Sequence, residues 1–437
     1  MDDERMNPDL VVDLLRSAWI IESARADVYR RWGDASEASA RRAEQRAGII
    51  AGGLSGSGAN TDPDLVEPHS RWVRSLIGDR GGEVPLGDLF LARVADWVDA
   101  HAGPYSADPD GLRGLGAEEK QTLAFPEQLP PPPPFEPVPA LPCEPPGEVV
   151  FRLGILSDLH FGSAIGDALA HAAIADLNRS GAELVIQLGD ITDHGDPEEF
   201  ELANKALARL EMPVTTMLGN HDIFSIKEQR LMGREIYRAS FGRVPDGTIL
   251  EHKGWRLAVL DSATDAASPF PAYNLVTGSF DEGPGGAVVQ GSLTHVQHDI
   301  LADLAAPGAG PAFVFLHHPP QPFTAFPPVL FGLRDADSGR LHAAVDSGNV
   351  WGVFAGHTHR NARTRDFDGV PAHEVAIPRD FPFGYALVEV TRRGYGYRFV
   401  QISDEELLRE AYARAGAIHR RYALGTTSER SFVWTVS

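Results

Sequence analysis

The sequence predicts an α/β protein of layered architecture, and three observations lead to this prediction. From Val149 onwards, short apolar runs alternate with helical stretches, which is the pattern of buried strands joined by helices. Residues 1–125 show helical periodicity instead, and a proline-rich segment separates the two regions. The chain has 437 residues, so two domains or one enlarged domain are expected.

The first 125 residues are predicted to form an additional helical domain. Apolar residues three and four positions apart between Leu10 and Trp32 define one helical face. Further helices are expected over Ala35–Ile50, Asp62–Ile77 and Leu86–Ala102, and a helical bundle is the simplest assembly. The role of this domain stays open between a cap on an active site, a surface for homo-oligomerisation and a binding site for a partner.

A proline-rich linker is expected over residues 126–147, where 11 of the 22 residues are proline. Such a segment forms neither a helix nor a central strand and favours polyproline II. A semi-rigid spacer is the first interpretation. The alternatives are a strap packed on the body of the protein and a docking ligand for a proline-binding module.

Residues 148–402 are predicted to form the catalytic domain, and residues 403–437 a C-terminal helix and tail. Helices are expected over Ala164–Arg179 and Glu198–Leu210, the second with Pro197 at its first position. The expected strands are Val149–Leu156, Leu184–Leu188, Val214–Leu218, Arg256–Leu260, Ala312–Leu316, Val350–Ala355, His373–Ile377, Gly384–Val390 and Tyr397–Ile402.

Composition and charge limit the classes of function. Hydrophobic residues make up 43% of the chain, and the formal net charge is −22. So acidic a surface disfavours binding to a nucleic-acid polymer or an anionic membrane through charge alone. No apolar stretch is long enough for a membrane span, and the acidic N-terminus lacks a signal-peptide core. With a single cysteine and therefore no disulfide framework, a cytoplasmic bacterial protein is the default expectation.

Five short motifs with polar side chains each follow an apolar run directly. In chain order they are Asp158-Leu-His160, Gly189-Asp190, Gly219-Asn220-His221-Asp222, His317-His318-Pro319 and Gly356-His357-Thr358-His359. In open α/β sheets, ligands bind beyond the carboxyl ends of the strands. Residues that lie far apart in the chain are therefore expected to meet in one site.

The motifs supply oxygen and nitrogen donors suited to two adjacent metal ions. Asp158 and His160 are two positions apart, as are His357 and His359, so each pair can point the same way where a strand ends. The glycine before Asp190 lets the backbone turn, and this carboxylate has two oxygens with which to bridge two metals. Donors without thiolates suit manganese or iron first, with zinc or cobalt as alternatives. Two metals about 3.5–4 Å apart are a common device for attacking phosphate esters.

The motif order D-x-H, G-D, G-N-H-D, H-x-P, G-H-x-H resembles the calcineurin-like metallophosphoesterase superfamily over roughly residues 150–400. The strings Ser157–His160, Gly189–Asp193, Gly219–Asp222 and Leu316–Pro320 are most similar to the bacterial class III cyclic-nucleotide phosphodiesterases. The resemblance implies a four-layer αββα sandwich with a dinuclear metal centre.

Carried over residue by residue, the resemblance divides the donors between two metal ions. It implies that Asp158, His160 and His359 hold the first ion, that Asn220, His317 and His357 hold the second, and that Asp190 bridges the two. The family ligand stands two positions before a proline, which selects His317 rather than His318.

The resemblance also implies a mechanism. His221 would contact the phosphate and protonate the leaving oxygen as general acid, with Asp222 orienting its ring. A metal-bridging hydroxide would be the nucleophile. Of the remaining histidines, His194 is expected to border the pocket or be structural, and His318 to touch substrate or be structural.

The expected activity is that of a metal-dependent phosphodiesterase on a small, cyclic-nucleotide-like substrate. A phosphomonoesterase or a nucleotide pyrophosphatase on a small metabolite is the alternative. A non-catalytic binding scaffold of the same fold is a remote third class, because all seven ligand positions and His221 are filled. Two long loops, 264–291 and 319–339, are expected to shape specificity, with Phe323 or Phe326 either stacking on a nucleobase or packing within the loop.

Overall fold

The computed structural model describes most of the chain from residue 134 to residue 436. Within that range the gaps are residues 226, 229, 243–245, 264–271, 275–278, 282–290, 321–331, 368–369 and 415–422. Only residues 41, 44, 47 and 48 are described further upstream, and they are helical, within the expected Ala35–Ile50 helix. The rest of the predicted N-terminal helical domain lies outside the described residues.

The chain divides into two compact units. One comprises Met1–Pro131, Tyr273–Ser279 and Phe323–Leu330; the other comprises Pro132–Ala272, Phe280–Pro322 and Phe331–Ser437. All five motifs lie in the second unit, which contains both large sheets.

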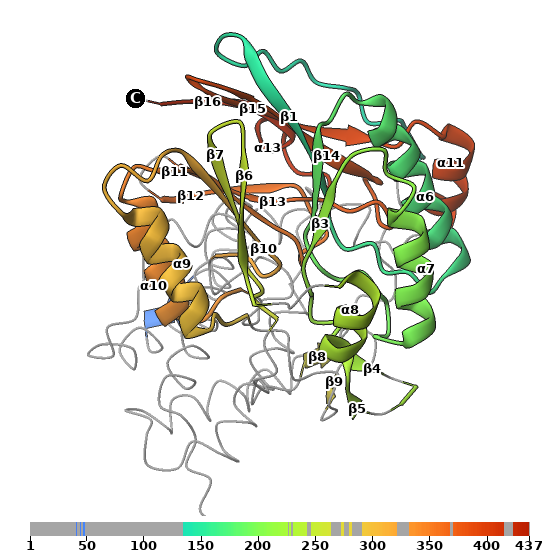
Figure 1. The fold of residues 1–437 in the computed structure, drawn as a ribbon. Coiled ribbons are helices and arrows are strands. Elements are labelled where there is room, and N and C mark those ends of the chain that lie inside the picture. The colour runs from blue at the N-terminus through green and yellow to red at the C-terminus, as the bar shows by residue number, and fades with distance from the viewer. Residues whose placement is uncertain are drawn as a thin grey trace, which may run out of the picture. The chain divides into compact units, whose positions relative to one another are not determined.

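The first sheet has six strands in the order β16-β15-β14-β1-β2-β3 (Figure 1). They are β1 (Val149–Leu156), β2 (Leu184–Gln187), β3 (Val214–Thr216), β14 (Gly384–Thr391), β15 (Gly394–Gln401) and β16 (Ser431–Thr435). Strands β1, β2 and β3 are parallel, whereas β14, β15 and β16 continue the sheet in antiparallel pairs.

The second sheet has six strands in the order β12-β13-β11-β10-β7-β6. They are β6 (Thr248–His252), β7 (Trp255–Val259), β10 (Ala312–Leu316), β11 (Val350–Ala355), β12 (Ala362–Phe367) and β13 (Val370–Glu374). Strands β7, β10, β11 and β13 are parallel, and an antiparallel strand lies at each edge. Two small two-stranded sheets pair β4 (Phe224–Ser225) with β5 (Arg230–Leu231), and β8 (Ala272–Asn274) with β9 (Ser279–Asp281).

The helices of the second unit pack on the two large sheets. They are α6 (Ala164–Arg179), α7 (Pro197–Leu207), α8 (Gly233–Phe241), α9 (His295–Ala305), α10 (Asp335–Val345), α11 (Glu405–Arg414) and α13 (Thr427–Arg430). Helix α6 begins at Ala164 because the Ser163 hydroxyl accepts the Gly166 amide, and it buries residues three and four apart such as Leu169, Ala173 and Leu177.

Among the described residues, three hydrophobic clusters give the order of the layers. One joins α6, α7 and α11 to the first sheet, with Leu156 and Val185 among its members. A second lies between the sheets, where residues such as Ile155 of β1 meet Phe315 of β10. The third joins α9 and α10 to the second sheet through Leu304 and other residues. The predicted α/β architecture, with two mixed sheets and packed helices, is confirmed.

Most of the predicted element boundaries agree closely with the structure. The ranges of β1, α6, β10 and β11 agree to the residue. Helix α7 ends at Leu207, three residues earlier than predicted, and β15 begins at Gly394 because it forms a tight hairpin with β14. The C-terminal tail was not expected to form a strand, yet β16 pairs along β15 from Ser431 to Thr435.

The described part of the proline-rich segment packs as a strap. The Val138 amide donates to the side chain of Gln401 at 2.8 Å, and the Phe135 ring lies 5.3 Å from that of Tyr412. Close to the edge of the first sheet, the Ser431 hydroxyl donates to the Pro142 carbonyl at 2.9 Å. Contacts of this kind favour the strap over a free spacer for residues 134–147.

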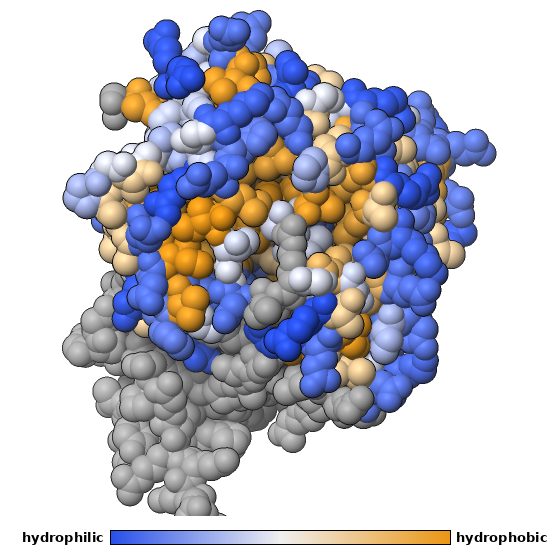
Figure 2. Space-filling view, in the orientation of Figure 1, coloured by the Kyte–Doolittle hydropathy of each residue, from blue (hydrophilic) through white to orange (hydrophobic). Residues whose placement is uncertain are grey.

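The outer helices and the middle of the molecule differ in surface character. Figure 2 shows mainly hydrophilic residues over α6 and α7, and apolar residues gathered in the middle of the same face. Within the described part of the chain, no helix combines the length and the apolar character needed to cross a membrane.

Candidate metal centre

The five motifs lie at the carboxyl ends of parallel strands from both large sheets. Strands β1, β2 and β3 of the first sheet lead into Asp158, Asp190 and Asn220. Strands β10 and β11 of the second sheet lead into His317 and His357. The predicted convergence of distant segments is therefore what the fold produces.

Hydrogen bonds join the motif loops to one another. The amides of Asp158 and His160 donate to the carbonyls of Gly189 and Asp190 at 3.1 and 3.0 Å. The His357 amide donates to both carboxylate oxygens of Asp158, at 2.9 and 3.1 Å, and so links the two sheets. The loops fix one another, which holds the side chains in place before any ligand binds.

Close packing requires glycine at two of the motif positions. A Cβ atom at position 219 would lie 2.1 Å from Oδ1 of Asp190, and one at position 356 would lie 2.5 Å from Oδ2 of Asp158. Any larger residue at Gly219 or Gly356 would displace the carboxylate beside it.

Five of the seven predicted ligands have a left-handed backbone. The φ angles are 44° at Asp158, 46° at His160, 48° at Asp190, 71° at His357 and 54° at His359. Residues other than glycine adopt this region at a cost of about 1–3 kcal/mol each, and such residues gather at functional sites. The strain falls in three of the five motif loops, which indicates that side-chain placement there takes precedence over local stability.

Asp158, His160, Asp190 and His359 form the first group of donors. Their potential ligand atoms all lie within 4.8 Å of one another. The Nε2 atoms of His160 and His359 are 3.0 Å apart, and Nε2 of His359 lies 3.6 Å from Oδ1 of Asp158. All four side chains are at least four-fifths buried.

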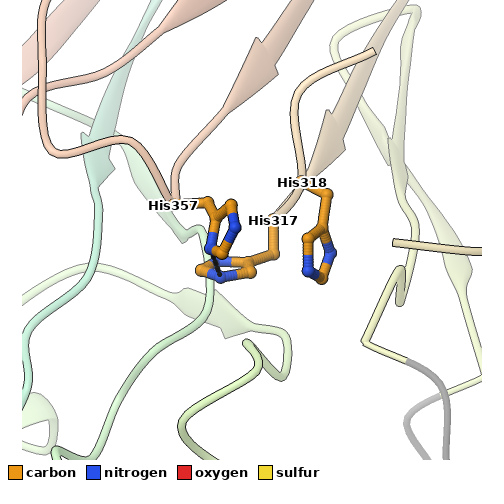
Figure 3. A group of neighbouring side chains, drawn as sticks. All are labelled: His317, His318 and His357. Atoms are coloured by element: carbon orange, nitrogen blue, oxygen red, sulfur yellow. Dashed lines mark hydrogen bonds between the residues drawn. The ribbon is translucent and has the colours of Figure 1, made fainter. Parts of the chain in front are cut away.

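Asn220, His317 and His357 form the second group. Nε2 of His317 lies 3.0 Å from Oδ1 of Asn220 and 3.1 Å from Nδ1 of His357. Figure 3 shows the rings of His317, His318 and His357 gathered beyond the ends of β10 and β11. The His318 ring has its Nδ1 2.9 Å from the hydroxyl of Ser262, which lies in the segment after β7.

Asp190 lies between the two groups and directs one oxygen to each. Its Oδ2 lies 3.6 Å from Nε2 of His160, and its Oδ1 lies 3.5 Å from Nε2 of His317. Every residue that the sequence placed at a metal is therefore brought into one continuous cluster, with Asp190 in its middle.

Burial sets the charge of the cluster. It raises the pKa of the Asp158 and Asp190 carboxyls well above the ordinary value, and the charges of Asp190 and Asp222 respectively raise them further. Burial likewise lowers the pKa of His160, His317 and His357 well below the ordinary value. The histidines are held neutral, which is the form that binds metals, and the carboxylates require a nearby positive charge.

The position of the proton on the His317 ring leaves electron-pair donors facing one another, which favours a cation between them. Nδ1 of His317 donates to the Leu188 carbonyl at 2.8 Å, so Nε2 of the neutral ring carries a lone pair. That lone pair faces Oδ1 of Asn220, Nδ1 of His357 and Oδ1 of Asp190. Buried electron-pair donors that face one another in this way are stabilised by a positive ion between them. The His, Asp and Asn donors fit a pair of divalent metal ions.

His221 differs from the other predicted residues because its side chain is exposed. Its amide donates to Oδ1 of Asp190 at 2.9 Å, and its ring lies edge-on to that of His160 with the centroids 4.6 Å apart. Its Nδ1 lies 2.8 Å from the Asp193 carbonyl oxygen, which leaves Nε2 as the atom for a further partner. The ring therefore stands over the donor cluster and is open to solvent.

The contacts of Asp222 lie within and between the motif loops. Its buried carboxylate accepts the amides of Gly219, Thr192 and Ile191 at 2.9, 2.8 and 3.1 Å, and the Thr192 hydroxyl at 2.7 Å. The ring of His221 is held by the Asp193 carbonyl instead. Asp222 thus ties the loop after β2 to the loop after β3, because four donors already occupy its oxygens.

Sequence reasoning missed several residues around the cluster. Oδ2 of Asp380 lies 2.8 Å from Nδ1 of His359, and Oδ1 of Asp193 lies 3.3 Å from Nδ1 of His160 and pairs with Arg379. Asp193 belongs to the Gly189–Asp193 segment but has no role predicted from the sequence. Asp380 lies outside every motif. The one available signal was a charged pair, Arg379 and Asp380, in an otherwise apolar stretch before β14.

The remaining sequence expectations concern the border of the site. His194 is half-exposed and has its Nδ1 2.8 Å from the carboxylate of Glu199, with its Nε2 3.8 Å from Asp193. It therefore lies one side chain away from the donor cluster. Phe323 and Phe326, and most of the two long loops, lie outside the described residues.

Comparison with known proteins identifies the family of this domain. Residues 151–361, which contain all five motifs, match the family described as calcineurin-like phosphoesterase. This part of the chain is a calcineurin-like phosphoesterase domain.

The curated relatives that are similar to this region include two bacterial proteins. A probable cyclic nucleotide phosphodiesterase of Rhodococcus erythropolis is 28% identical over 199 residues, which is 44% of this chain and 56% of that protein. A cAMP/cGMP dual specificity phosphodiesterase of Mycobacterium tuberculosis is 26% identical over 219 residues, 48% of this chain and 59% of that protein. The match thus spans a little over half the length of each relative.

Solved structures of similar fold include phosphatases. A dimetal phosphatase from Danio rerio has a TM-score of 0.44 at 16% identity, covering 58% of this chain and 98% of that one. A purple acid phosphatase from yellow lupin has a TM-score of 0.40 at 12% identity, covering 60% and 53%.

Proposed function

We propose that the protein is a dinuclear metal-dependent phosphodiesterase that hydrolyses a small, cyclic-nucleotide-like substrate. The observation that carries the proposal is the position of Asp190, with one carboxylate oxygen near His160 and the other near His317. A carboxylate in this position can bridge two ions, and paired ions suit the in-line displacement at phosphorus.

Two divalent ions are assigned to the cluster. Asp158, His160 and His359 would hold one, Asn220, His317 and His357 the other, and Asp190 would belong to both. Manganese or iron suits these oxygen and imidazole donors first, and zinc or cobalt second. When bound, such ions supply Lewis-acid stabilisation of the phosphate and activate water as a nucleophile near neutral pH.

His221 is assigned the role of general acid. Its exposed ring stands beside that of His160, and the Asp193 carbonyl accepts from Nδ1, which leaves Nε2 for a further partner. A doubly protonated ring in this orientation can donate the Nε2 proton to the leaving oxygen of a bound phosphate ester. The ring would also lie where negative charge develops and would stabilise it.

A diester substrate is favoured by the relatives, which are named as cyclic nucleotide phosphodiesterases. The formal net charge of −22 argues against a polyanionic nucleic acid, whereas a small phosphate ester can be attracted by the bound ions themselves.

A phosphomonoesterase or nucleotide pyrophosphatase on a small metabolite remains the second candidate, because the same cluster can act on either bond. A non-catalytic scaffold of the same fold is the third. The complete set of seven donors, together with His221 over them, favours an enzyme over a scaffold.

Hydrolysis assays with metal-loaded protein test the proposal. We expect turnover of bis-p-nitrophenyl phosphate in the presence of Mn²⁺ and faster turnover of a cyclic nucleotide than of the corresponding nucleoside monophosphate. A preference for the monoester would select the second candidate. A protein that binds two ions per chain yet hydrolyses none of these substrates would select the scaffold.

A further inference from the structure

The loop between β13 and β14 reaches the first group of donors from outside the five motifs. Oδ2 of Asp380 lies 2.8 Å from Nδ1 of His359, while Nε2 of the same ring faces His160 and Asp158. A carboxylate at this distance accepts the Nδ1 proton, which fixes both the orientation of the ring and the nitrogen that carries the lone pair.

Arg379, which precedes Asp380 in the loop, is connected to His160, the other histidine of the group, through Asp193. The guanidinium of Arg379 pairs with Oδ1 of Asp193, and the same oxygen lies 3.3 Å from Nδ1 of His160. Asp193 therefore lies between Arg379 and Nδ1 of His160, a buried nitrogen that this carboxylate approaches without forming a hydrogen bond.

The loop itself is held firmly enough to position these side chains. The Phe383 amide donates to the Asp380 carbonyl at 2.6 Å, and the Gly384 amide donates to the Ile377 carbonyl at 3.1 Å. Phe381 and Phe383 are buried in the cluster under α6 and α11, so the part of the loop that follows Asp380 is anchored in the core.

The second group of donors is oriented differently. The outer nitrogen of His317 donates to the main-chain carbonyl of Leu188, which lies at the end of β2 and 2.8 Å away. Neither Arg379 nor Asp380 makes any of the contacts described for His317 or Asn220.

From this asymmetry we propose that residues 378–383 form a clamp that orients both histidines of one metal site, with Asp380 and Arg379 as positioning residues. The proposal rests on the proposed function in that it takes the cluster to bind two ions. The clamp determines the affinity for the ion held by His160 and His359, and it leaves the other ion unaffected. Outer partners of this kind change metal affinity by about 10–100-fold when removed.

Mn²⁺ binding to the full-length, chelator-stripped protein tests the clamp directly. Isothermal titration should resolve two binding steps for the wild-type chain. We expect Asp380→Asn to weaken one step by about 10–100-fold and to leave the other within about twofold. Arg379→Gln should weaken the same step, and Asp380→Glu, which restores an acceptor, should recover part of the loss.

Two control variants remove one carboxylate and one guanidinium far from the loop 378–383 in sequence. Asp303→Asn breaks an exposed pair with Arg256, and Arg409→Gln breaks an exposed pair with Glu405, so neither should change either step. Combining Asp380→Asn with Asn220→Ala identifies the ion, because the two changes should weaken different steps.

The outcomes separate the clamp from the proposed function. Wild-type protein that binds no Mn²⁺ would contradict the dinuclear centre itself. Wild-type protein that binds two ions, with Asp380→Asn indistinguishable from Asp303→Asn, would overturn the clamp alone. Equal weakening of both steps by Asp380→Asn, together with a lower melting temperature, would also overturn it, because the residue would then act through general stability.

Discussion

The Nε2 atoms of His160 and His359 face each other at 3.0 Å, although 199 positions separate the two residues in the chain. His160 follows a strand of the first sheet and His359 follows a strand of the second, so the pair joins the two sheets at the site. Because burial lowers the pKa of His160, the ring is neutral and presents a metal-binding form. The pair is a direct consequence of two mixed sheets whose parallel strands end at the same place.

Removal of metal should lower stability as well as activity. The buried carboxylates of Asp158 and Asp190 have raised pKa values in the absence of a cation, so a divalent ion relieves unfavourable charge burial. At free Mn²⁺ 100 times the dissociation constant, one site adds about 2.7 kcal/mol to the free energy of unfolding. Thermal unfolding with and without a chelator measures this. Equal melting temperatures at saturating Mn²⁺ and after stripping would contradict it.

Replacing His221 by alanine should lower turnover while both ions stay bound. Loss of a general acid typically reduces kcat by about 10²–10⁴-fold. The loss should be smaller for bis-p-nitrophenyl phosphate than for a cyclic nucleotide, since p-nitrophenolate needs less help from a proton. Metal content per chain, measured beside kcat, decides the assignment: a variant that loses an ion would make His221 a ligand instead.

Replacing Asp222 should act mainly on stability. In Asp222→Ala the amides of Gly219, Thr192 and Ile191 lose a buried acceptor, and one such group left unsatisfied costs about 1–3 kcal/mol. We expect the free energy of unfolding to fall by about 3 kcal/mol, with a smaller loss for Asp222→Asn, which keeps one oxygen. Urea titration measures both. Unchanged stability combined with a His221→Ala-like loss of kcat would instead restore the orienting role that the sequence predicted.

Buried His373 should make folding sensitive to acid. Its ring is stacked on Phe432 and Tyr397, and burial together with the Arg363 charge lowers its pKa well below the ordinary value. As pH falls below about 6.5, the unfolded chain binds a proton that the folded chain does not, so stability decreases by up to about 1.4 kcal/mol per pH unit until the folded pKa is reached.

The variant His373→Phe should therefore lose less stability than the wild type between pH 7 and pH 5.5, as measured by urea unfolding at each pH. His295→Gln, at an exposed position, is the control and should follow the wild type. Identical pH dependence in all three proteins would show that His373 does not contribute.

The site residues that could be predicted from the sequence are those that directly follow a strand. An apolar run followed by a polar motif placed Asp158, Asp190, Asn220, His317 and His357 together, because the carboxyl ends of parallel strands share one edge. The same patterns gave β1, α6, β10 and β11 to the residue. These elements could be predicted because hydrophobic periodicity and turn residues are visible in the local sequence.

The parts that could not be predicted depend on contacts between distant segments. Asp380, in the loop before β14, contacts His359, and the charged pair that it forms with Arg379 in the sequence does not indicate this partner. Asp222 follows His221 in the chain, yet its carboxylate accepts amides of its own loop and of the loop after β2. Strand β16 likewise forms because β15 offers it an edge, and the sequence at Ser431–Thr435 alone does not distinguish a strand from a tail.

The most direct test of the dinuclear centre is anomalous diffraction from crystals grown with Mn²⁺. We predict two peaks about 3.5–4 Å apart, one among Asp158, His160 and His359, the other among Asn220, His317 and His357, with Asp190 between them. A single peak, or a second ion held by His318 with Asn220 turned away, would contradict the account.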